Sequence, residues 1–283
     1  MTCIHPTAIV HSKVKLGKGV KIGPYCVIDS PDVVLEEGVE IKSHVHIDGN
    51  VYIKKETKIY PFASIGSPPQ KHHYDELEKN PIEIGAECEI REYVSINSSH
   101  GKGEKVTIGD NCFIMAYSHI AHNCTIGNFV VMANGATLGG HVSVGDHANL
   151  GGLCAIHQRC RIGEYAMIGG GSMIGTDVPP FSIGSGYPIK LHGLNWIGLK
   201  RKKVPHEALK TLVKGYRITF QSGLSWKDAR AEILLSLDMN PYLQKWVEFC
   251  DRSTRGLTTA HEKKIQVPSK SDPLKYNELA EVT

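Results

Sequence analysis

The sequence predicts a parallel β-helix of hexapeptide repeats followed by a smaller α-helical domain, and three observations support this fold class. From residue 108 to residue 179 an aliphatic residue or Met stands at every sixth position, twelve times in succession, from Ile108 to Ile174. A small or β-branched residue follows each of these after four positions. Beyond Pro179 and Pro180 the apolar spacing changes to three and four residues, which is typical of helices.

A period of six fits neither the 3.6 residues of an α-helical turn nor the two-residue alternation of a free strand. Hexapeptide repeats are typical of a parallel β-helix, in which each hexad supplies one short strand and one corner. The large aliphatic side chain points inward, the small residue fills the space beside it, and Gly, Asp and Asn make the bend. Three hexads close a triangular coil of 18 residues. Known hexapeptide proteins have left-handed coils, against the usual crossover rule, and by this similarity we expect an all-β left-handed parallel β-helix.

The β-helix is expected to occupy residues 1–190, with one slip of the hexad phase near residue 31. Two segments without aliphatic residues at the required positions, 66–83 and 97–107, are predicted to be inserted loops. Loops on a rigid scaffold often carry function, and the first contains polar side chains, among them Gln70 and His73, that suit a polar ligand. The second loop is rich in Gly and Lys and fits a solvated turn equally well.

A helical domain is predicted for residues 191–257, with helices beginning near Pro205, Ser225 and Pro241. Such a domain covers the end of the solenoid, which would otherwise expose strand edges and core. The apolar pattern then ends, and residues 258–283 are expected to form a disordered tail.

The composition limits the compartment and the partners. Six of the eight cysteines stand at the small inward position of a hexad, which predicts reduced, buried thiols rather than disulfides or metal ligands: Cys26, Cys88, Cys112, Cys124, Cys154 and Cys160. No segment is apolar enough to span a membrane, and the chain opens directly into the repeat without a signal peptide, so we expect a cytoplasmic protein. A formal charge of +3 is too small to indicate nucleic acid as a partner.

Three histidines recur at nearly the coil length. His122, His141 and His157 are separated by 19 and 16 residues, each close to 18, which predicts one column on successive coils, with His119 on the same coil as His122. Stacked strands lie about 4.8 Å apart, so such a column could surround one small substrate. Solvated surface histidines, a zinc site as in trimeric hexapeptide carbonic anhydrases, and a non-catalytic scaffold are the alternatives.

Five motifs together resemble one family, the acyl-carrier-protein-dependent UDP-N-acetylglucosamine O-acyltransferases of lipid A synthesis. They are SHIAHNCTIGN (118–128), LGGHVSVGD (138–146), AIHQRCRIG (155–163), NWIGLKRK (195–202) and RSTRGL (252–257). The resemblance covers residues 1 to about 257. It implies transfer of a long acyl or 3-hydroxyacyl chain from acyl carrier protein to the 3-hydroxyl of UDP-N-acetylglucosamine, the first step of lipid A synthesis. It also implies a homotrimer with the histidine column at the cleft between subunits, no cofactor and no bound metal.

The resemblance also implies roles for individual residues. His122 matches the general base, Gly140 matches the residue whose N–H stabilises the oxyanion, and Asn123 stands beside the base where the family usually has Asp. Lys71 and Ile197 likewise replace acidic residues of the family. The residues that match family positions for the sugar nucleotide or the acyl-pantetheine arm are Gln70, His119, His141, His157, Gln158, Gly170, Asn195 and Arg201. Of these, Gly170 matches the position that limits acyl length. Apart from the resemblance, we expect His73 of the first loop to contact the ligand and Lys202 of the basic run 200–203 to contact the acyl carrier protein.

The nearest alternative function is the N-acyltransferase that acts later in the same pathway. Those enzymes carry an additional domain before their hexads, whereas here the hexads begin at Ile4. The sequence leaves open which acyl chain is used and whether the sugar accepts it on oxygen or nitrogen.

Overall fold

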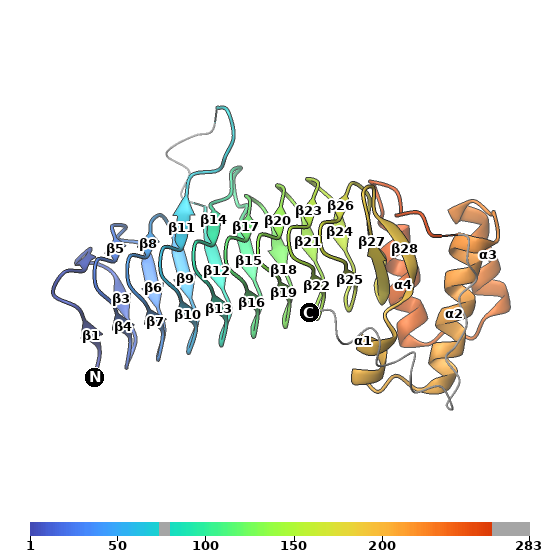
Figure 1. Ribbon diagram of the computed structural model, residues 1–283, viewed down its shortest axis with the longest axis horizontal. Coiled ribbons are helices and arrows are strands. Elements are labelled where there is room, and N and C mark those ends of the chain that lie inside the picture. Colours follow the sequence, from blue (N-terminus) through green and yellow to red (C-terminus); the bar gives the residue numbers. More distant parts are fainter. Residues whose placement is uncertain (74–79, 262–283) are drawn as a thin grey trace.

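The computed structural model describes residues 1–73 and 80–261 and consists of a long prism of three parallel sheets followed by helices (Figure 1). Sheet 1 contains, in order, β1 (Cys3–Ile4), β4 (Lys21–Ile22), β7 (Glu40–Ile41), β10 (Lys58–Ile59), β13 (Glu89–Ile90), β16 (Phe113–Ile114), β19 (Val131–Met132), β22 (Asn149–Leu150), β25 (Met167–Ile168), β27 (Ser182–Ser185) and β28 (Lys190–Leu194). Sheet 2 contains β2 (Ile9–Val10), β5 (Val27–Ile28), β8 (His46–Ile47), β11 (Ser64–Ser67), β14 (Ser95–Asn97), β17 (His119–Ile120), β20 (Thr137–Leu138), β23 (Ala155–Ile156) and β26 (Met173–Ile174). Sheet 3 contains β3 (Lys15–Leu16), β6 (Val33–Leu35), β9 (Val51–Ile53), β12 (Ile82–Ile84), β15 (Val106–Ile108), β18 (Thr125–Ile126), β21 (Ser143–Val144) and β24 (Arg161–Ile162).

The hexad aliphatics form the core, as the sequence predicts. In sheet 2, for example, Ile120, Leu138 and Ile156 lie in register on successive coils, and each is buried. The six cysteines of the small inward position are also buried, and burial raises the pKa of the Cys124 and Cys154 thiols to about 12. The Cys124 and Cys154 thiols therefore fill the core and are poor nucleophiles.

One edge of the prism carries both inserted loops and most of the predicted active-site residues. We call it the histidine edge; it comprises the corners that connect each strand of sheet 2 to the next strand of sheet 3. The first loop runs between β11 and β12, and the second runs between β14 and β15. Within the predicted bounds of the loops, Ile82 and Glu83 already belong to β12, and Asn97 belongs to β14. Figure 1 shows the first loop projecting from the prism at this edge. Residues 74–79 of that loop lie outside the described residues.

The end of the solenoid differs from the sequence prediction. Residues 181–195, which lack a regular pattern, form a hairpin: β27 continues sheet 1 in parallel to β25, and β28 then pairs antiparallel with β27. The predicted boundary at residue 190 therefore falls inside this hairpin. Sequence reasoning missed it because its strands follow neither a six-residue nor a helical period.

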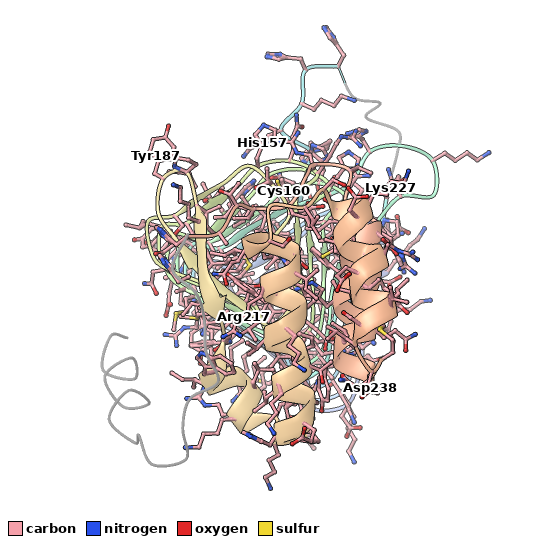
Figure 2. The ribbon with its side chains drawn as sticks, turned by 90° about the vertical axis from the view of Figure 1, so that its right-hand side faces the viewer. His157, Cys160, Tyr187, Arg217, Lys227 and Asp238 are labelled. Carbon is pink, nitrogen blue, oxygen red and sulfur yellow. The ribbon has the colours of Figure 1, made fainter. Side chains whose placement is uncertain are left out.

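Among the described residues, four helices follow the hairpin: α1 (Trp196–Arg201), α2 (His206–Gln221), α3 (Trp226–Ser236) and α4 (Pro241–Asp251). Ser225 caps α3 and Pro241 is the first residue of α4, as predicted, whereas Pro205 is the N-cap of α2 rather than its first residue. Helix α1 was not expected from the sequence, although Asn195 caps it by accepting from the Gly198 N–H. Figure 2 shows the helices standing across the end of the β-helix.

Part of the predicted tail is ordered. Residues 258–261 lie along the solenoid, where Thr258 donates its N–H to the Asp177 carbonyl and His261 donates to the Leu191 carbonyl. Residues 262–283 lie outside the described residues, and the prediction of disorder there is untested. Within the described part of the chain, the helices are too short or too polar to cross a lipid bilayer.

Candidate active site on the histidine edge

Three imidazoles meet on the histidine edge. His122 lies in the corner after β17, His141 lies in the corner after β20, and His100 comes from the second inserted loop. The ring centroid of His122 is 4.6 Å from that of His100 and 5.2 Å from that of His141. The proximity of His122 and His141 agrees with the predicted column. The sequence did not identify His100, because the loop that carries it breaks the hexad phase.

Asn123 fixes the orientation and the tautomer of His122. Its side-chain Nδ2 donates to the His100 carbonyl and to a Glu104 carboxylate oxygen, each at 3.1 Å. Because Nδ2 faces two acceptors, the Asn123 Oδ1 must be the atom that lies 2.8 Å from His122 Nδ1. Nδ1 therefore carries the proton and donates it to Oδ1, which leaves the lone pair on Nε2. That tautomer is the one that a general base acting through Nε2 requires.

Gly140 allows His122 to lie close to the backbone of the next coil. A Cβ added at Gly140 would lie 2.3 Å from His122 Cε1 and 2.6 Å from Nε2, so a side chain there would displace the ring. The N–H of Gly140 has no hydrogen-bond partner within the described chain, whereas its carbonyl accepts from Arg159. The corner therefore presents a backbone donor beside the imidazole lone pair.

Burial keeps two neighbouring histidines neutral. His119 lies half-buried on β17, with its Nδ1 2.7 Å from the Ser95 hydroxyl, and burial, followed by the charge of His122, lowers its pKa. The pKa of His141 is lowered first by burial and then by Arg159 and the other two histidines, while Glu104 opposes the shift. Both imidazoles can therefore offer hydrogen bonds at neutral pH without adding charge to the site.

His157 and Gln158 lie on the same edge but not in the three-histidine cluster. The strand register pairs Ala155 with Thr137 and Ile156 with Leu138. On the next coil His157 is therefore in register with Gly139, which comes two residues before His141 in the sequence. Both His157 and Gln158 are exposed, and His157 Nδ1 lies 3.0 Å from the Gln158 carbonyl. The 16-residue spacing is the cause, because it falls two residues short of a full coil. In Figure 2, His157 lies on the side from which the first inserted loop projects.

The remaining predicted residues lie further from His122. Gln70 and His73 are exposed on the first inserted loop. Gly170 lies on the edge between sheets 1 and 2, where an added Cβ would be 3.2 Å from the Gly152 carbonyl oxygen.

Three more predicted residues lie beyond the β-helix, at its helical end. Asn195 Nδ2 donates to the Tyr165 carbonyl, on the edge between sheets 3 and 1. Lys202 lies over the Tyr165 ring at 4.2 Å and pairs with Glu164, whereas Arg201 is exposed. Within one chain these residues are therefore on a different edge from His122.

Comparisons with known proteins show the family to which this chain belongs. Residues 177–258 match the family described as UDP-N-acetylglucosamine O-acyltransferase, domain 2, and residues 105–140 match the bacterial transferase hexapeptide family. The acyl-[acyl-carrier-protein]–UDP-N-acetylglucosamine O-acyltransferase of Chlamydia caviae is 48% identical over 264 residues, which are 93% of this chain and 94% of the relative. The chain belongs to this family of acyltransferases. The family, the fold class and the acyltransferase activity expected from the sequence are thereby confirmed.

Another sequence relative and two solved structures agree with this family. The enzyme of the same name from Thermodesulfovibrio yellowstonii is 46% identical over 91% of this chain and 99% of its own. The structure of LpxA from Acinetobacter baumannii superposes with a TM-score of 0.87 at 35% identity, covering 90% of this chain and 99% of that one. LpxA from Bacteroides fragilis gives a TM-score of 0.86 at 32% identity, with 90% and 99% coverage.

The contact between Asn123 and Glu104 yields a first prediction. Asn123→Asp would place a second carboxylate against Glu104 and push the side chain off His122, so we expect a reduced kcat. Glu104→Gln in the same chain should restore kcat, because a Gln amide can donate to the introduced carboxylate. Since Glu104 is exposed, the expected coupling energy is at the low end for residues in contact, about 0.5–1 kcal/mol.

The measurement is a double-mutant cycle on kcat. Glu104→Gln alone serves as the control and should stay close to wild type, because a Gln carbonyl still accepts from Asn123. Additive effects of the two substitutions would show that the two side chains do not interact during turnover.

Proposed function

We propose that this chain transfers an acyl group from acyl carrier protein to the 3-hydroxyl of UDP-N-acetylglucosamine, with His122 as the general base. The observation that carries the proposal is the fixed tautomer of His122: Nδ1 donates to Asn123, so the Nε2 lone pair is available beside the Gly140 N–H. A base and an oxyanion donor side by side are what acyl transfer needs.

The reaction follows from these two groups. His122 Nε2 accepts the proton of the sugar hydroxyl as that oxygen attacks the thioester carbonyl carbon, so a C–O bond forms and the carbonyl oxygen becomes negative. The Gly140 N–H stabilises that oxyanion. The C–S bond then breaks, and the imidazolium returns its proton to the pantetheine sulfur, which leaves as a thiol. Asn123 keeps the ring oriented throughout, although a neutral amide stabilises the imidazolium less than a carboxylate would.

The surrounding side chains suit the two substrates. His119, His141, His157 and Gln158 provide hydrogen-bonding groups along the histidine edge, and Gln70 and His73 approach from the first inserted loop. The acyl chain arrives already activated on the phosphopantetheine arm, so the reaction needs no cofactor. The curated relatives are named O-acyltransferases, which favours the hydroxyl over an amino group as the acceptor.

A cyclic trimer would complete the site. Asn195, Arg201 and Lys202, which we expect to contact the substrates, lie on the edge between sheets 3 and 1. Within a single chain they are therefore on a different edge from His122. Cyclic symmetry brings two different surfaces of the same prism together at each interface, so three chains would create three complete clefts. Exposed Arg201, with Lys200 and Lys203 beside it, also suits docking of an acidic acyl carrier protein.

His122→Ala should fold normally and lose turnover. A corner residue adds little to the core, whereas a general base contributes about 10²- to 10⁴-fold to the rate. The assay is kcat with acyl carrier protein as donor, with thermal melting as a check on folding. His46→Ala, an exposed histidine on β8, is the matched control and should keep wild-type kcat. If His122→Ala retained more than about a tenth of wild-type turnover, another group would have to be the base.

The trimer can be tested by light scattering and by complementation. We expect a mass of three times 31.1 kDa. His122→Ala and Arg201→Ala should each be inactive alone, yet mixed trimers assembled from equal amounts should recover about a quarter of the wild-type activity, because each cleft takes one residue from each neighbour. Absence of recovery in verified mixed trimers would mean that each site lies within one chain, and a fully active monomer would rule out the trimer.

Gly170→Met should shorten the preferred acyl chain by several carbons. Even a Cβ at Gly170 approaches the next coil closely, so a longer side chain must project outward, where we expect the acyl chain to end. Product mass spectrometry with a panel of acyl carrier proteins gives the preference. Gly175→Met, at a glycine with open space around it, is the control. If the preferred acyl-chain length did not change, Gly170 would have only a structural role, as a turn residue.

A further inference from the structure

We propose that His100, His122 and His141 bind a single Zn²⁺ ion, and that this ion inhibits acyl transfer by occupying the base. The inhibitory part rests on the proposed role of His122; the binding part does not. The three side chains are the one group of three or more potential ligands that the structure brings together among the described residues.

The spacing suits one small ion. One ring nitrogen from each histidine lies within 4.8 Å of the other two. Tetrahedral Zn²⁺ has Zn–N bonds of about 2.0–2.1 Å, which places ligand nitrogens roughly 3.4 Å apart. The approach from 4.8 Å to roughly 3.4 Å is within reach of side-chain rotation, because all three rings are only partly buried.

His122 already has the tautomer that a metal ligand needs, with its Nδ1–H hydrogen-bonded. Asn123 Oδ1 accepts from Nδ1, so Nε2 is the ring nitrogen of His122 whose lone pair can bind a metal ion. A metal-bound histidine almost always donates its other ring N–H to an oxygen in this way, which fixes the ring and increases its basicity. The ring lies against Gly140, in the space that a Cβ at that position would fill.

The donor set indicates the kind of ion. Three imidazoles favour Zn²⁺ and related transition metals such as Co²⁺ and Ni²⁺ over Mg²⁺ or Ca²⁺, which prefer oxygen. The Glu104 carboxylate, held 3.1 Å from Asn123 Nδ2, supplies negative charge next to the cluster. A fourth position would remain open for water.

Zinc and the proton of the sugar hydroxyl would compete for the same lone pair, on Nε2 of His122. The lone pair that accepts the proton in acyl transfer is the one that would bind the metal, so the bound ion removes the base. His100 is outside the reaction as proposed, which separates metal binding from catalysis: its loss should release the ion and leave turnover intact.

The test uses the whole chain freed of metal with a chelator. Calorimetric titration with ZnCl₂ should give one ion per chain, and Co²⁺ should give the visible absorption of a nitrogen-ligated tetrahedral site. Zn²⁺ should abolish acyl transfer, and chelation should restore it. His100→Gln should keep wild-type kcat in metal-free buffer while raising the half-inhibiting Zn²⁺ concentration by about tenfold or more. His46→Gln, an exposed histidine far along the solenoid, should behave like wild type.

The outcomes separate the two proposals. Absence of the Co²⁺ spectrum, or an unchanged Zn²⁺ affinity in His100→Gln, would overturn the site. Binding that depends on His100 but leaves turnover unchanged, or increases it, would overturn inhibition. A chain that binds Co²⁺ through His100 yet transfers no acyl group would support the metal site and contradict the proposed acyl transfer instead.

Discussion

The register between coils is the constraint on which the rest of this structure depends. From β1 to β27 each strand is only two to four residues long, so no strand is stable alone, and backbone hydrogen bonds to the neighbouring coils hold it in place. Register is enforced by the core: a slip of one residue would turn Ile120 or Leu138 outward and bring a polar neighbour inside. Because the coils cannot slip, a side chain on one corner has a fixed distance to its equivalent on the next.

The proposed active site depends on that fixed distance at a corner, where the backbone must turn sharply. Asn123 and His141 both occupy the left-handed region, with φ of 60°, a conformation that Asn adopts at lower cost than most residues. His141 donates its N–H to the carbonyl of His122, so the two imidazoles are tied through the backbone as well as by proximity. Gly140 completes the arrangement, since only a residue without Cβ leaves room for the ring. The three residues thus have structural reasons for their identity in addition to their proposed chemical roles.

The sequence predicted what depends on period and missed what depends on departures from it. The six-residue period and the 18-residue coil predict the solenoid, its buried cysteines and the proximity of His122 to His141. The hairpin of β27 and β28 was not predictable in this way, because its pairing is antiparallel and its residues have no repeat. His157 was assigned to the column from a spacing of 16, and the two missing residues put it outside the cluster. The position of His100 depends on how the second inserted loop folds back onto the coils, which the repeat does not indicate.

Insertion into one edge explains how a uniform scaffold acquires a specific site. Lengthening a corner between sheets 2 and 3 leaves the stacking of strands intact, since β14 pairs with β17 and β15 with β18 as in uninterrupted coils. The loop is then free to lie over the next coil, and this one brings His100 and Glu104 to Asn123. Judged by sequence alone, Asn123 is the loss of an acidic residue beside the proposed base. In three dimensions the carboxylate stands one hydrogen bond further away, on Glu104, and the Asn amide connects it to His122 while preserving the tautomer that the proposed base requires. The departure at position 123 and the composition of the second loop are therefore one structural feature.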